Sequence, residues 1–229
     1  LSEAGKRVIV LNVPVTYPPR RVNGVLVSGF LTPRLEKATF PPEASEELAK
    51  LGYIIDVDPW QARRDKDALL DQVDAALQAR ERAFFHFMDQ GVWDYAHCHI
   101  METDRLHHFL WEEMANDHPV YAPRFFAFYR RIDGFLGRIR QRLDKDTTLI
   151  VMSDHGFCTL RKEVYVNHWL ASKGWLKFAV EPPKSLEDIH PETHAYSLDP
   201  GRIYLNVHGR EPAGSVEPGA EYERLRSEI

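Results

Sequence analysis

Apolar residues in this chain fall into two patterns, short continuous runs and longer stretches with helical spacing. Short runs are typical of strands buried on both faces, and apolar residues three or four positions apart are typical of amphipathic helices. The runs predict strands at residues 7–13, 25–30, 53–57, 95–101, 149–152, 195–196 and 202–207. The helical spacing predicts helices at residues 44–51, 65–90, 105–116, 123–143 and 165–173. This alternation predicts an α/β fold with a mainly parallel central sheet flanked by helices.

The strand predicted at residues 149–152 stops at Asp154 and His155, and Gly156 then allows a sharp turn. Open α/β sheets bind ligands at the carboxyl ends of their strands. A carboxylate beside an imidazole at such an edge is costly to desolvate, and a divalent cation that binds both offsets the cost. In the alternative interpretation Asp154 caps the following segment and His155 lies on the surface. This short motif alone does not decide between the two.

A second strand, predicted at residues 95–101, also leads to an Asp and a His. Asp104 and His108 are one helical turn apart at the start of the helix predicted at residues 105–116. The alternative makes Asp104 the N-cap residue of that helix and His108 a partly buried helical residue. Two strand ends that each pair Asp with His favour metal binding over capping. A right-handed crossover from one strand to the other would bring both pairs to one sheet edge.

Other metal-ligand types cluster near these motifs. His97 and His99 flank Cys98 along a predicted strand, which resembles an H-x-H zinc pair. Neutral histidines packed against helices need no metal, so we favour Asp104 and His108 as ligands. Cys98 and Cys158 are the two cysteines of the chain, and we expect both to be small buried residues.

Composition and charge narrow the function classes. The chain is 44% hydrophobic and 28% charged over 229 residues, which is typical of a folded globular protein. A net charge of -5 argues against a broad basic face that binds nucleic acid. No apolar run approaches the length of a membrane span. The sequence does not indicate an oligomeric state.

Three segments together resemble a known family. They are D-R-x-x-H-x-x-W at residues 104–111, S-D-H-G-F at residues 153–157 and G-R-I-Y-L-N-V-H-G-R-E-P at residues 201–212. With the segments at residues 4–19 and 22–33, they resemble the type I phosphodiesterase/nucleotide pyrophosphatase branch of the alkaline phosphatase superfamily. The resemblance covers nearly the whole chain, and the two Asp-His motifs carry most of its specificity.

The resemblance implies an alkaline-phosphatase-like fold and two divalent metal ions, zinc or alternatively manganese. Asp104 and His108 would hold one ion, and Asp154 and His155 the other. An in-line displacement at phosphorus takes place over such a pair of ions. The family also uses a further Asp, a Thr or Ser nucleophile and a late His, none of which we can place in this chain.

These unplaced residues lead us to expect an interior fragment of a longer protein, with an incomplete fold and the nucleophile outside the chain. Residues 1–229 would then be part of one catalytic domain, and residues of about 14–65 an insertion or cap near the mouth of the active site. The expected activity is hydrolysis of small phosphate esters, foremost phosphodiesters or nucleotide pyrophosphate bonds. The alternatives are a phosphomonoesterase, sulfatase or phosphosugar mutase of the same superfamily, or a non-catalytic domain that retains the fold.

Overall fold

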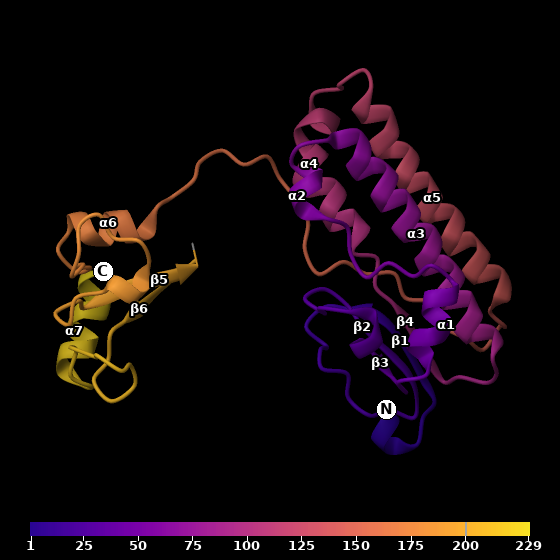
Figure 1. Ribbon diagram of the computed structural model, residues 1–229, viewed down its shortest axis with the longest axis horizontal. Coiled ribbons are helices and arrows are strands. Elements are labelled where there is room, and N and C mark those ends of the chain that lie inside the picture. The colour runs from indigo at the N-terminus through magenta and orange to yellow at the C-terminus, as the bar shows by residue number, and fades with distance from the viewer. Residues whose placement is uncertain (200) are drawn as a thin grey trace. The chain divides into compact units, whose positions relative to one another are not determined.

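The computed structural model describes residues 1–199 and 201–229 (Figure 1). The chain forms two compact units, unit 1 at Leu1–Thr159 and unit 2 at Leu160–Ile229. Unit 1 contains all four residues that the sequence predicts as metal ligands. Each unit has its own hydrophobic core and is described by itself.

Unit 1 is built on a four-stranded sheet in the order β3-β2-β1-β4. Its strands are β1 (Val8–Val13), β2 (Gly24–Ser28), β3 (Thr39–Phe40) and β4 (Tyr95–Cys98). The middle strand β1 pairs in parallel with both β2 and β4, and β3 is an antiparallel edge. Leu11 of β1 lies opposite Val27 and Cys98, and both Leu11 and Val27 are fully buried. The mainly parallel sheet that the apolar runs predict is therefore confirmed for these strands.

Helices flank this sheet. They are α1 (Ala44–Lys50), α2 (Pro59–Ala62), α3 (Lys66–Asp89), α4 (Glu102–Ala115) and α5 (Tyr121–Arg142), with short 3-10 turns η1 (Ser2–Ala4) and η2 (Leu35–Lys37). The long helix α3 contacts β1, α4 and α5. Its start is fixed by Asp65, whose carboxylate accepts a hydrogen bond from the backbone N–H of Ala68. In the part of the chain that the structure describes, none of the helices combines the length and the apolar character that spanning a bilayer requires.

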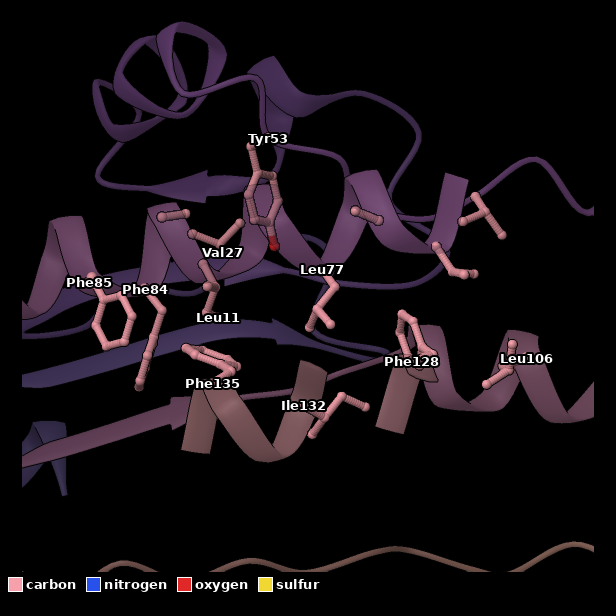
Figure 2. Close-up of a cluster of buried hydrophobic side chains, with 14 of the residues drawn as sticks. Leu11, Val27, Tyr53, Leu77, Phe84, Phe85, Leu106, Phe128, Ile132 and Phe135 are labelled. Carbon is pink, nitrogen blue, oxygen red and sulfur yellow. The ribbon is translucent and has the colours of Figure 1, made fainter. Parts of the chain in front are cut away.

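The core of unit 1 lies between α3, α5 and the sheet (Figure 2). Phe135 of α5 meets Phe84 and Phe85 of α3 edge to face, with ring centroids 6.1 Å and 5.4 Å apart. Such tilted aromatic pairs are favourable because the positive ring edge meets the negative ring face. The apolar residues that recur with helical spacing in α3 and α5 are therefore the residues that form this core.

Unit 2 is a small α/β unit. It contains α6 (Val166–Ser172), η3 (Leu186–Asp188), β5 (Ala195–Asp199), β6 (Arg202–Leu205) and α7 (Ala220–Glu228). β5 and β6 pair antiparallel, with Ala195 opposite Leu205. The buried Asn206 follows β6, and its side-chain amide donates hydrogen bonds to the carbonyls of Thr193 and Ala213 at 2.8 and 2.9 Å.

The prediction of a strand at residues 149–152 is wrong. The segment has no secondary structure, and its four apolar side chains are 41–79% exposed. A strand needs a hydrogen-bonded neighbour, and β4 is left as an edge of the sheet. An apolar run shows that a segment can be buried, but it does not supply the partner. The crossover that was to bring both Asp-His pairs to one sheet edge is therefore absent among the described residues.

The prediction of a strand at residues 53–57 is also wrong. The carbonyls of Ile54 and Ile55 accept hydrogen bonds from the guanidinium of Arg80, at 3.2 and 3.3 Å. A side chain from α3 thus occupies acceptors that a neighbouring strand would use.

Candidate metal centre

The first two turns of α4 carry Asp104 and His108. The helix begins at Glu102, and Met101 is its N-cap residue without a side-chain cap, so the interpretation of Asp104 as the N-cap is wrong. Oδ1 of Asp104 lies 3.3 Å from Nε2 of His108, one turn later on the same face. A carboxylate in the first turn is also favoured by the helix dipole. The spacing of four residues between Asp104 and His108 therefore brings their side chains into contact.

Asp154 and His155 lie in the irregular segment after α5. Oδ2 of Asp154 is 3.5 Å from Nε2 of His155, and its Oδ1 accepts a hydrogen bond from the backbone N–H of His155 at 3.0 Å. Nδ1 of His155 lies 3.1 Å from the carbonyl oxygen of Gly156. This contact leaves Nε2 free to act as a ligand, because the other ring nitrogen is already engaged. Both side chains are exposed to solvent.

Both pairs have a donor separation that suits zinc. Zinc–oxygen and zinc–nitrogen bonds of about 2.0–2.2 Å in a tetrahedron place neighbouring ligand atoms about 3.3–3.5 Å apart. The measured separations are 3.3 Å for Asp104 with His108 and 3.5 Å for Asp154 with His155. Within residues 1–199 and 201–229, however, no group of three or more such ligands converges on one point. Each pair therefore brings two possible ligand atoms together.

Phe157 connects the segment of the second pair to α4. Its ring centroid lies 4.5 Å from that of His107, 5.1 Å from that of His108 and 5.3 Å from that of His155. Phe157 is half-buried, whereas its neighbours on both sides are exposed. The aromatic ring therefore anchors the S-D-H-G-F motif beside the first turns of α4.

His107 belongs to an aromatic cluster and not to the helix face that carries Asp104 and His108. Its Nε2 lies 2.8 Å from the hydroxyl of Tyr129, and its ring contacts those of Trp111, Phe125 and Phe157. Burial lowers the pKa of His107, and the nearby carboxylate of Asp104 opposes that shift. His107 is therefore a packing residue that receives Phe157.

Among the described residues, no further metal-ligand side chain joins His97, Cys98 and His99 in a group of three or more. β4 ends at Cys98, and burial lowers the pKa of both His97 and His99. Burial raises the pKa of the Cys98 thiol to about 12, which keeps it protonated at neutral pH. Cys98 is partly buried and packs against the core of unit 1, so its expected role in packing is confirmed. Cys158 is exposed, so the expectation of burial is wrong for it.

One further contact at this site has no local signal in the sequence. Arg105 forms a bidentate ion pair with Asp56, in which Nε lies 3.0 Å from Oδ1. Nη1 of Arg105 also lies 3.5 Å from Oδ2 of Asp104. The guanidinium also lies over the ring of Phe30, 4.8 Å from its centroid. Asp56 and Arg105 are 49 residues apart, so no local spacing could reveal the pair. The contact fixes the first turn of α4 beside Asp104.

We expect replacement of Phe157 by alanine to release the segment that carries Asp154 and His155. Aromatic contacts of this kind contribute about 0.5–1.5 kcal/mol, which corresponds to a roughly 2- to 12-fold larger detached population. A nitroxide label on the exposed Cys158 would report this as faster motion in an electron paramagnetic resonance spectrum, because the protonated thiol of Cys98 reacts poorly. Leu160→Ala is the control, since Leu160 is 69% exposed. Equal label mobility in both variants would contradict the anchoring role.

Comparisons with known proteins give one match. Residues 1–228 match the family described as type I phosphodiesterase/nucleotide pyrophosphatase. The comparison with curated proteins and the comparison with solved structures each gave no match. The mixed α/β architecture of unit 1 is compatible with an alkaline-phosphatase-like fold. The family implies a hydrolase that acts on phosphate esters. The chain belongs to the type I phosphodiesterase/nucleotide pyrophosphatase family, within the alkaline phosphatase superfamily.

Proposed function

We propose that this chain is the metal-binding part of a phosphodiesterase or nucleotide pyrophosphatase with two divalent ions. Asp104 and His108 would hold one ion, and Asp154 and His155 the other, with zinc as the first choice and manganese as the alternative. The observation that carries this proposal is the donor separation in each pair, 3.3 Å and 3.5 Å, which suits two adjacent ligands of one zinc ion.

Two bound ions would neutralise the phosphate oxygens and stabilise the attacking and leaving oxygens of an in-line displacement. The residues of this chain contribute charge and orientation. Each carboxylate contributes one negative charge, and each imidazole presents Nε2 toward its carboxylate partner. The exposure of Asp154 and His155 leaves this pair accessible to a small phosphate ester.

The proposal includes a Thr or Ser hydroxyl as nucleophile, a role that we assign to no residue of this chain. By analogy with the family, the hydroxyl would form a covalent phospho-enzyme. The proposal also keeps residues 1–229 as part of one catalytic domain and residues of about 14–65 as a cap region.

The test is elemental analysis of this chain, combined with turnover of bis(4-nitrophenyl) phosphate by protein that also contains the proposed nucleophile. We expect about two zinc ions per unmodified chain and about one in each of the variants Asp104→Asn and Asp154→Asn, because each variant loses a charged ligand. Turnover should fall at least about 100-fold in both variants. Asp71→Asn is the matched control, because the Asp71 side chain is 81% exposed on α3 and pairs with Arg124.

Unchanged metal content in both ligand variants would overturn the proposal. Faster turnover of 4-nitrophenyl phosphate than of the diester would instead support the phosphomonoesterase alternative, since the same ion pair can serve either substrate.

A further inference from the structure

A buried ion pair joins α3 to the start of α4. Arg80 is 0% exposed and Glu102, the first residue of α4, is 2% exposed. Nε of Arg80 donates to both carboxylate oxygens of Glu102, at 3.2 and 3.4 Å, and Nη2 donates to Oε1. Both oxygens of Glu102 are therefore engaged inside the protein. Glu102 is thus not available as a metal ligand.

The remaining donors of Arg80 bind the segment that follows α1. Nη1 donates to the hydroxyl of Tyr53, and Nη2 donates to the carbonyls of Ile54 and Ile55. The guanidinium also lies over the Tyr53 ring, 5.1 Å from its centroid. We call Arg80, Glu102, Tyr53 and the two carbonyls the Arg80 network. It ties three segments of unit 1 together with directed hydrogen bonds.

A buried ion pair of this kind adds little net stability to the fold. Removing two charges from water costs about as much as their attraction returns, and apolar residues of similar volume often stabilise a core equally well. Hydrogen bonds to a planar guanidinium provide direction, because its donors point along fixed axes. The Arg80 network therefore constrains where the first turn of α4 lies.

The constraint extends to the candidate metal ligands. Asp104 comes two residues after Glu102 in the same turn, and Asp56 directly follows the carbonyls that bind Arg80. Asp56 holds Arg105, whose Nη1 lies 3.5 Å from Oδ2 of Asp104. Residues 53–56 thus hold this turn through Arg80 on one side and through Arg105 on the other.

We propose that Arg80 and Glu102 are positioning residues, which set the first turn of α4 so that Asp104 and His108 bind the same ion. This inference rests on the proposed function. The network contributes no ligand; it determines the affinity of the site by fixing the carboxylate of Asp104 relative to the imidazole one turn later.

The test is zinc affinity of the full chain, measured by competition with a coloured chelator at a temperature where every variant is folded. Glu102→Gln should weaken one of the two zinc sites about 10-fold, as expected when a residue behind a ligand is lost. Glu81→Gln is the matched control, because it breaks the exposed pair of Glu81 with Arg138 between α3 and α5. This control should bind zinc as the unmodified protein does.

A double variant separates positioning from stability. Arg80→Met with Glu102→Leu replaces the pair by apolar side chains of similar volume, and it should recover the melting temperature lost in Glu102→Gln. Zinc affinity should remain weak, because the directed hydrogen bonds are still absent. Zinc affinity that recovers together with the melting temperature would overturn the inference, as would normal affinity in Glu102→Gln.

The same titration distinguishes the two proposals. Normal zinc binding by Asp104→Asn would contradict the proposed function itself. Loss of one site in Asp104→Asn together with normal binding in Glu102→Gln would contradict only the positioning role.

Discussion

Substitution of Gly24 by alanine is expected to lower the free energy of unfolding of unit 1 by roughly 3 kcal/mol or more. Gly24 is the first residue of β2, lies opposite Val8 in β1 and has a φ of +132°. A Cβ at this position would lie 2.1 Å from the carbonyl oxygen of Val8 and 2.9 Å from its nitrogen. Both are backbone atoms of the central strand, so neither can move without breaking the β1–β2 ladder.

Gly5→Ala is the control for this variant. Gly5 also has a positive φ, of +76°, but an added Cβ would meet nothing within 4 Å. This variant should cost only about 1 kcal/mol, the strain of the backbone conformation. Urea unfolding followed by circular dichroism measures both variants. Equal losses would show that conformation alone sets the cost and that the close approach to Val8 does not.

Replacement of Phe135 by alanine should lower the free energy of unfolding by about 3–5 kcal/mol. The side chain is 1% exposed and contacts the rings of both Phe84 and Phe85 (Figure 2). Its removal leaves a cavity that the two long helices cannot close, because each is held by many other contacts. The same urea titration measures the loss.

Phe126→Ala on the same helix is the matched control. Phe126 is 45% exposed, so its removal should cost less than about 1 kcal/mol. Similar losses in the two variants would contradict the position of the core between α3 and α5.

The elements that the sequence predicts well are those with a long local signal. Helices α3 and α5 span 24 and 22 residues, and their apolar spacing repeats over many turns. β1 and β2 lie at the centre of the sheet and read as continuous apolar runs. The start of α4 is three residues earlier than predicted, because Glu102 is held from a distance by Arg80 and no local cap marks the boundary.

What the sequence could not show depends on contacts between distant segments. Residues 53–57 look like a strand, yet two of their carbonyls bind a side chain on α3. At the candidate site, spacing predicts the contact of Asp104 with His108 and of Asp154 with His155, and both contacts exist. Their role as metal ligands stays a prediction. The anchoring of Phe157 on α4 was not predictable, since nothing in S-D-H-G-F specifies its partners.

The exposed run at residues 149–152 has a consequence for the behaviour of the protein in concentrated solution. Four adjacent apolar side chains, two of them β-branched, form a segment that can pair with the same segment of another molecule or with an open sheet edge. Lys145 and Asp146 precede this run and Asp154 follows it, and such flanking charges oppose self-association. If Asp154 binds a cation as proposed, one of these charges is neutralised. Metal loading and colloidal stability are then coupled through a single carboxylate.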